Sequence, residues 1–164
     1  TIYNKVAARL RLGENFFYVG SLQHALEEER KAYRMAMKAG DSNLLSYVRQ
    51  NLASTFEEIG EKDSCLYYAR LAYDLNAANR FSCLLTFASA YISVDSLNQA
   101  FSLLKQAMPK TAEDRYSVFY FQSQAAMKAH DFKSAKSFSD SAYHYLEDMY
   151  RTALQGKAAY YTSF

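Results

Sequence analysis

Small side chains recur along this sequence at a nearly constant interval, and this periodicity restricts the possible folds more than any other feature. Gly13 is followed by Ala53, Ala88, Ser123 and Ala158, at steps of 40, 35, 35 and 35 residues. The same steps connect three further series: Gly20, Gly60, Asp95 and His130; Ala25, Cys65, Ala100 and Ala135; and Ala32, Ala72, Ala107 and Ala142. Four series with one period predict a chain made of successive copies of one structural unit.

The residues between these positions are typical of helices. The sequence holds one proline and five glycines in 164 residues, and it has no strand-like alternation of any length. An aromatic residue stands three positions after four of the five small residues of the first series, at Phe16, Phe56, Tyr91 and Tyr161, with Ala126 at the remaining place. Start and stop signals predict helices at about 6–19, 22–39, 43–59, 62–77, 80–94, 97–108, 112–129, 132–147 and 150–162.

Three of these stretches, RLGENFF (11–17), LASTF (52–56) and FASAY (87–91), resemble the L-G-x-x-Y element of the tetratricopeptide repeat (TPR). The resemblance covers about residues 6–164, but Arg9, Arg49, Leu84, Phe119 and Leu154 stand at the repeat's tryptophan position and its closing proline is missing. It implies an all-α, right-handed superhelical array of antiparallel helix pairs, an α-solenoid of about nine helices. Residues 1–164 would form one TPR-like domain, with units at about 6–39, 46–79, 81–112 and 116–149 and a partial unit at 150–164.

Each series of recurring residues has an expected structural role. The series that start at Gly13, Ala25 and Ala32 are expected to pack where two helix backbones approach closely, because a larger side chain there would force the helices apart. The series that starts at Gly20 is expected to end the first helix of each unit in the left-handed conformation. Glycine adopts this conformation freely, and Asp and His tolerate it better than branched residues do.

Charge and motifs give no sign of catalysis, of a metal or cofactor, or of nucleic-acid binding. The formal net charge is only +2, and His24, His130 and His144 have no carboxylate or cysteine at metal-ligand spacing. We expect a non-enzymatic protein without cofactors, with Cys65 and Cys83 as buried reduced thiols. The run EEERK at 27–31 is expected to be a solvated helix face, on which Glu27 pairs with Lys31.

The resemblance also implies a groove, lined by the first helix of each unit, that holds a peptide or protein surface. The expected groove residues are Leu10, Glu14, Phe17 and Tyr18; Tyr47, Gln50, Ser54 and Glu57; Leu85, Ser89 and Ile92; and Tyr120, Gln124, Met127 and Lys128. The chaperone-binding subclass clamps a C-terminal carboxylate with a lysine and asparagines, and the corresponding positions here lack that clamp. The alternative is that these residues only cover the inner wall or pack on another part of the same chain.

A second hypothesis makes this chain the sensory or regulatory segment of a larger signalling protein, such as a repeat-bearing bacterial transcription regulator or receptor kinase. It is motivated by the partial last unit, whose apolar Leu154, Ala158 and Tyr161 need cover from a further helix or from self-association. A third hypothesis is an enzyme with an unrecognised pocket. No apolar run is long enough to span a membrane and no secretion signal is visible, so compartment (cytoplasmic or periplasmic), partner and oligomeric state are left open.

Overall fold

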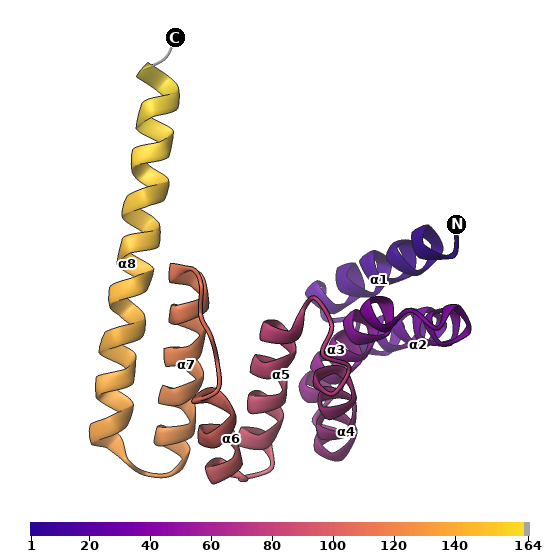
Figure 1. The fold of residues 1–164 in the computed structure, drawn as a ribbon, viewed down its shortest axis with the longest axis horizontal. Coiled ribbons are helices and arrows are strands. Elements are labelled where there is room, and N and C mark those ends of the chain that lie inside the picture. The colour runs from indigo at the N-terminus through magenta and orange to yellow at the C-terminus, as the bar shows by residue number, and fades with distance from the viewer. Residues whose placement is uncertain (163–164) are drawn as a thin grey trace. The chain divides into compact units, whose positions relative to one another are not determined.

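The described part of the chain is built from helices joined by short turns. A computed structural model describes the backbone of residues 1–162 and the side chains of residues 1–155. Over residues 1–162 it contains eight helices and no strand (Figure 1). They are α1 (Ile2–Tyr18), α2 (Leu22–Ala39), α3 (Ser42–Ile59), α4 (Lys62–Tyr73), α5 (Arg80–Ser93), α6 (Leu97–Leu104), α7 (Ala112–Lys128) and α8 (Phe132–Thr162). The chain divides into two compact units, Thr1–Ser96 and Leu97–Phe164, and each is described by itself.

Every expected turn between the two helices of a repeat unit adopts one backbone structure. In the first, Gly20 has a φ of +76°, its N–H donates to Phe17 O at 2.9 Å, and the N–H of Ser21 donates to Phe16 O at 2.8 Å. This pair of bonds is the Schellman motif, which satisfies carbonyl groups left free at a helix end. The same motif recurs where Gly60, Asp95 and His130 have φ values of 88°, 60° and 59°. The predicted left-handed positions are therefore confirmed.

The N-terminal unit consists of two helix pairs and a fifth helix. α1 packs on α2, α3 packs on α4, and α2 and α4 each pack on the helix that follows. In addition, α1 contacts α3 and α3 contacts α5, so the first helices lie beside one another. This is the nesting expected for stacked helical repeats, in which each unit covers the apolar face of its neighbour.

Arginines at the tryptophan position of the repeat bind the second helix of their own pair. The guanidinium of Arg9 donates to Glu28 Oε2 at 2.6 Å, and that of Arg49 donates to the carbonyl of Leu71 at 3.1 Å. Lys31 also donates to Glu28, at 2.7 Å, and these two cations hold the pKa of Glu28 below its usual range. Polar contacts therefore join these helix pairs at a position where the repeat usually has an aromatic ring.

Most of the recurring small residues are buried. Gly13 is buried against α2, and a Cβ atom there would lie 3.1 Å from Glu29 Cγ. The other buried members are Ala25, Ala32, Ala53, Cys65, Ala72, Ala88, Ala100, Ser123, Ala135 and Ala142. Ala107 differs because it lies after the end of α6 and is only half-buried. The prediction that Ala107 is a packing residue within a helix is therefore wrong. The predicted packing position Ala158 lies outside the side chains that the structure describes.

Helix boundaries differ from the prediction at four places, and the first is the start of α1, which begins at Ile2 instead of about residue 6. α8 is one continuous helix, so the expected separate helices at 132–147 and 150–162, and the total of nine, are wrong. No glycine or proline occurs between residues 132 and 155, so nothing interrupts the backbone hydrogen bonds there. α6 ends at Leu104 instead of 108, shortly before Pro109, and α4 ends at Tyr73 instead of 77, before Asn76 with its φ of 49°.

The C-terminal unit consists of α6, α7 and α8. α7 begins with a capping box, in which the hydroxyl of Thr111 accepts from the N–H of Asp114 at 3.0 Å and the Asp114 carboxylate accepts from the N–H of Thr111 at 3.0 Å. Ser123, the small residue of this unit, shares a hydrogen bond of 2.7 Å with Ser139 and donates to the carbonyl of Ala135 at 3.1 Å. These two bonds join α7 to α8.

Candidate functional site

The expected groove residues of the N-terminal unit lie on three helices that are joined by polar contacts. Asn51 of α3 donates to Glu14 of α1, with Nδ2 and Oε1 3.3 Å apart. On the other side of α3, Gln50 donates to Thr86 of α5 at 3.3 Å. The face made by these first helices is therefore connected by side-chain hydrogen bonds from α1 through α3 to α5.

Three of the expected partner-binding residues are engaged inside the unit. The side-chain oxygen of Gln50 accepts from Asn79 at 2.8 Å and from Ser82 at 3.1 Å. Glu57 accepts a hydrogen bond of 2.6 Å from Ser89, and burial raises the pKa of Glu57. Gln50, Glu57 and Ser89 thus hold α3 against α5. These three residues pack on another part of the same chain, which is the alternative given for the groove residues. Leu10, Leu85 and Ile92 are half-buried on the same helices, and Tyr47 is exposed.

Four expected groove residues meet around one cavity. It has a volume of about 220 Å³ and lies among α1, α2 and α3. Its walls are formed by Glu14, Phe17, Tyr18, Glu29, Asn51, Ser54 and Thr55. Phe17 and Tyr18 form an edge-to-face aromatic pair with ring centroids 5.8 Å apart, and the Tyr18 side chain is 83% exposed. The cavity therefore has an aromatic side that is open to solvent.

Glu29 supplies a buried carboxyl group to this cavity. It is only 1% exposed, and its Oε1 accepts a hydrogen bond of 2.8 Å from Thr55 Oγ1. Its Oε2 is buried and has no hydrogen-bond partner among the described residues. Burial raises the pKa of Glu29 to about 7, the hydrogen bond from Thr55 opposes this rise, and the charge of Glu14 adds to it. Such an unsatisfied polar group is rare in a protein interior and marks a site to explain.

Sequence reasoning missed Glu29, because the run EEERK was expected to be solvated. That expectation is wrong for Glu28 and Glu29, which are both buried, and Lys31 pairs with Glu28. A signal was present, since Glu29 falls four residues after Ala25 and three before Ala32, on the apolar stripe of α2. Gly13 belongs to the same arrangement, because a larger residue there would press against the Glu29 side chain.

A larger depression of the N-terminal unit lies among α2, α3 and α4. It has a volume of about 680 Å³ and is lined by Gln23, Leu26, Arg30, Phe56, Ile59, Glu61, Asp63, Ser64, Tyr67 and Tyr68. None of its lining residues carries a buried polar atom without a partner among the residues whose side chains are described. It also lies away from the expected groove positions on α1 and α3, so the smaller cavity is the better candidate.

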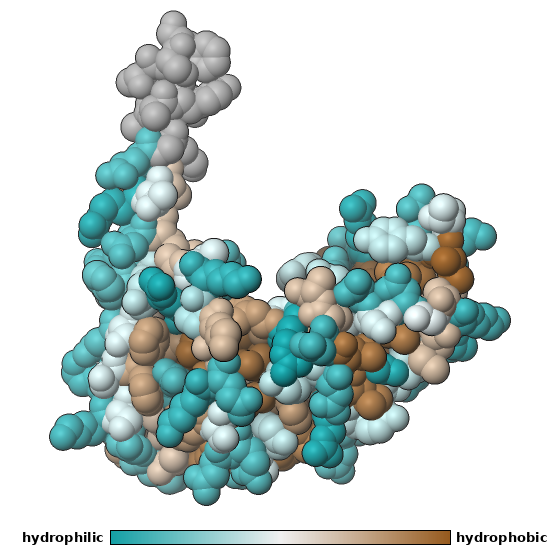
Figure 2. Space-filling model, in the orientation of Figure 1, coloured by the Kyte–Doolittle hydropathy of each residue, from teal (hydrophilic) through white to brown (hydrophobic). Residues whose placement is uncertain are grey.

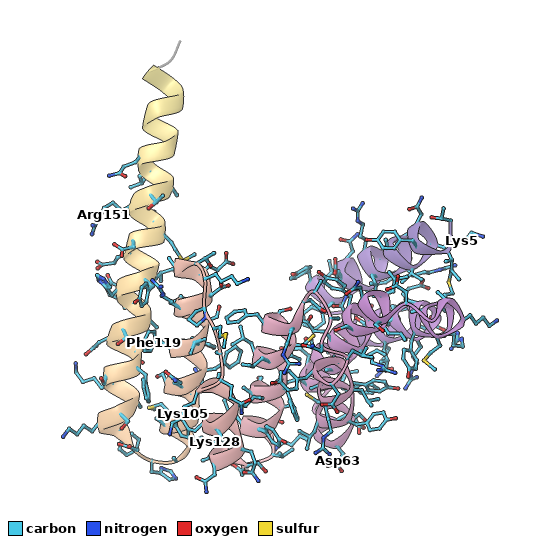
Figure 3. The ribbon with its side chains drawn as sticks, viewed as in Figure 1. Lys5, Asp63, Lys105, Phe119, Lys128 and Arg151 are labelled. Atoms are coloured by element: carbon cyan, nitrogen blue, oxygen red, sulfur yellow. The ribbon has the colours of Figure 1, made fainter. Side chains whose placement is uncertain are left out.

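The remaining groove candidates belong to the C-terminal unit. Tyr120, Gln124, Met127 and Lys128 are exposed on α7, and Tyr120 stacks on Tyr116 with ring centroids 6.1 Å apart. Phe119 of the same helix points toward α8 (Figure 3), where it stacks on Tyr145 at 5.8 Å.

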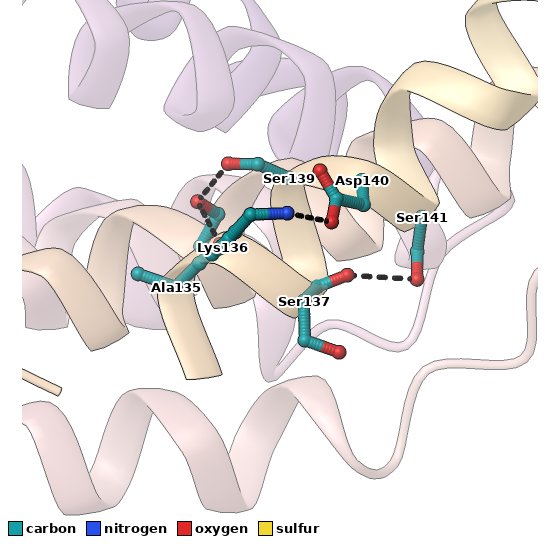
Figure 4. A network of polar contacts seen from close by, with 7 residues as sticks. Ala135, Lys136, Ser137, Ser139, Asp140 and Ser141 are labelled. Atoms are coloured by element: carbon teal, nitrogen blue, oxygen red, sulfur yellow. Dashed lines mark hydrogen bonds and ion pairs between the residues drawn. The ribbon is translucent and has the colours of Figure 1, made fainter. Parts of the chain in front are cut away.

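On α8, polar side-chain contacts lie near the start of the helix, and exposed apolar side chains lie further along it. Near the start of the helix, Lys136 pairs with Asp140 at 2.6 Å and the Ser141 hydroxyl donates to the Ser137 carbonyl at 3.0 Å (Figure 4). Further along, four exposed residues form what we call the α8 stripe, Tyr143, Leu146, Tyr150 and Leu154. Their spacing of three, four and four residues places them on one side of the helix. Elsewhere hydrophobic and hydrophilic residues are interspersed on the face of each unit shown in Figure 2.

The two cysteines and the three histidines form no reactive cluster in the described part of the chain. Cys65 and Cys83 are free and buried, and burial raises the pKa of the Cys65 thiol to about 12. No group of three His, Cys, Asp or Glu side chains within residues 1–155 could hold a metal ion. Among the helices of the described residues, none combines the length and apolar character that crossing a membrane requires.

Comparison with known proteins identifies the fold. No family model matches the sequence, and no curated protein matches it. Among solved structures, the chain is similar to nearly identical TPR-like repeats assigned to a kinesin light chain of Podosopora anserina. The similarity has a TM-score of 0.69 at 14% identity and covers 88% of this chain and 76% of that chain. The chain therefore has the all-α fold of a TPR-like helical repeat protein.

Proposed function

We propose that this chain is a non-enzymatic protein-interaction module that binds a peptide along the first helices of its N-terminal unit. The observation that carries the proposal is the cavity among α1, α2 and α3, because Glu14, Phe17, Tyr18 and Ser54 were all expected groove residues and all line it. An exposed aromatic side chain beside a concave site is a common anchor for peptide binding. Arrays of this fold offer such a surface on successive first helices.

The proposal predicts that peptides selected by display on the purified chain lose affinity when the aromatic side of the cavity is removed. Tyr18→Ala and Phe17→Ala are each expected to raise the dissociation constant at least about tenfold, because each replacement removes one aromatic ring from the contact surface. Isothermal titration calorimetry measures the change. Tyr3→Ala is the matched control, since Tyr3 is exposed on the same helix but does not line the cavity. Equal affinities for all four proteins would show that the peptides bind elsewhere.

We infer a second role from the α8 stripe, which is self-association of two copies of the chain. The side chains of the stripe are 44% to 67% exposed, although they are large and apolar. A second copy that packs its own stripe on this one would remove both surfaces from water, which is favourable. Such pairing is one of the two kinds of cover, besides a further helix, that the hypothesis of a regulatory segment in a larger signalling protein gave for the last unit.

Self-association predicts a concentration-dependent sedimentation coefficient in analytical ultracentrifugation. Leu146→Glu is expected to shift the chain to the monomer, because it places a charge within the stripe. Met108→Glu is the matched control, since Met108 is 81% exposed and lies outside α8. A parent chain that stays monomeric at all concentrations, or a Leu146→Glu variant that pairs as the parent does, contradicts the role.

A further inference from the structure

The size of the cavity among α1, α2 and α3 limits what can enter it. Pockets that enclose drug-sized ligands usually have volumes of about 300–1,000 Å³. This cavity has a volume of about 220 Å³, which suits a single side chain of a bound peptide better than a separate small molecule.

The polar groups around the cavity favour a ligand that donates hydrogen bonds and carries positive charge. Two carboxyl groups line it, Glu14 at its solvent-exposed side and Glu29 at its buried side, and no lysine, arginine or histidine does. Two of the donors in the lining are already directed at these carboxyl groups, Asn51 at Glu14 and Thr55 at Glu29. A ligand that brings negative charge would therefore be repelled by the two carboxyl groups.

Two cations that lie near this pair in the sequence bind a different carboxylate. Arg9 of α1 and Lys31 of α2 both bind Glu28, which is not one of the residues that line the cavity. Glu29 is left with a buried oxygen that has no partner among the described residues. Beside the two carboxyl groups stand the rings of Phe17 and Tyr18, and the faces of aromatic rings attract cations.

We propose that the cavity receives a lysine or arginine side chain of a bound peptide, whose cationic group pairs with Glu14 and Glu29 and contacts the ring of Tyr18. This inference rests on the proposed peptide-binding function and names the chemistry of its anchor. The aliphatic part of such a side chain packs along Phe17, and the charged end stays near the carboxyl groups. Peptides without a basic residue lack the positive charge that pairs with both carboxyl groups.

The test uses capped alanine pentapeptides whose central residue is lysine, arginine, norleucine or glutamate. NMR follows the ¹³C carboxyl resonance of Glu29 and the ring resonances of Tyr18 in the full chain. We expect the lysine and arginine peptides to shift both sets of resonances saturably and to lower the pKa of Glu29, because a bound cation stabilises the carboxylate. Norleucine has a similar length without the charge, and it should bind at least about tenfold more weakly.

Variants separate the basic anchor from general peptide binding. Glu29→Gln should abolish the preference for lysine over norleucine, whereas Glu27→Gln, on the exposed side of the same helix, should keep it. Tyr18→Ala provides a second variant, because its side chain is 83% exposed and its loss leaves the core intact. Equal binding of lysine and norleucine peptides, or no binding of any pentapeptide, overturns the inference. Display-selected peptides that still require Phe17 and Tyr18 would then leave the proposed function standing.

Discussion

Replacing Glu29 by glutamine is expected to stabilise the chain at high pH and to have little effect at low pH. In the parent, the pKa of Glu29 is about 7 in the folded state against 4.5 for an ordinary glutamate. The folded state therefore binds more protons than the unfolded state between these two values, so this group's contribution to the free energy of unfolding falls as the pH rises through that window. Above the window the loss amounts to about 3 kcal/mol.

The reason for this loss is that ionised Glu29 is a buried charge without a counterion among the residues whose side chains are described. Glutamine keeps the side-chain oxygen that accepts from Thr55 Oγ1, but it cannot ionise. The difference between the free energies of unfolding of Glu29→Gln and the parent should thus grow by about 3 kcal/mol between about pH 4 and about pH 8.5. The other shifted carboxyl groups, such as Glu28 and Glu57, are present in both proteins and cancel in this difference.

Urea unfolding followed by circular dichroism at a series of pH values measures this difference. Glu27→Gln removes an exposed carboxyl group from the same helix and is the matched control, for which no comparable pH dependence is expected. If the Glu29→Gln and Glu27→Gln variants change in the same way with pH, the Glu29 carboxyl is solvated and the description of the cavity is incorrect.

Leu52→Ala is expected to lower the free energy of unfolding by about 2–5 kcal/mol, which is the usual cost of truncating a fully buried leucine. Leu52 is 0% exposed, and it lies on α3, which contacts α1, α2, α4 and α5. A cavity at this residue removes packing from the helix that joins the whole N-terminal unit. The cost includes the lost transfer of the side chain from water and the void that is left.

Denaturant unfolding at neutral pH checks the effect of Leu52→Ala. Leu12→Ala is the matched control, because Leu12 is 40% exposed on α1 and its truncation should cost about 1 kcal/mol or less. A Leu52→Ala variant as stable as Leu12→Ala would mean that α3 is not at the centre of the unit.

The turns and most helix boundaries could be predicted because they depend on nearby residues. Gly20 and Gly60 adopt positive φ angles, and a glycine can do so wherever it stands in a fold. The break expected near residue 149 was wrong, since it was inferred from the repeat period and no residue there disfavours a helix. A period indicates where units recur, whereas the end of a helix needs a physical cause at that position.

The candidate site was predictable only in part. Phe17 and Tyr18 could be assigned to a groove from their places in the repeat, but the same reasoning included Gln50 and Glu57, whose polar atoms bind within the unit. A repeat position gives the side of the helix on which a residue lies. It does not specify whether the neighbouring helix presents a hydrogen-bond partner.

The sequence by itself determined the helical repeats, their turns and the small residues between helices, because backbone conformation and side-chain size are properties of each residue in its local stretch. Only the tertiary structure decided that Glu29 is buried beside Gly13 and lines a cavity with Glu14, Phe17 and Tyr18. Burial of a carboxyl group depends on which neighbouring helices cover it and how closely they approach. Those distances are set by the packing of α1 and α3 on α2, which no single segment specifies.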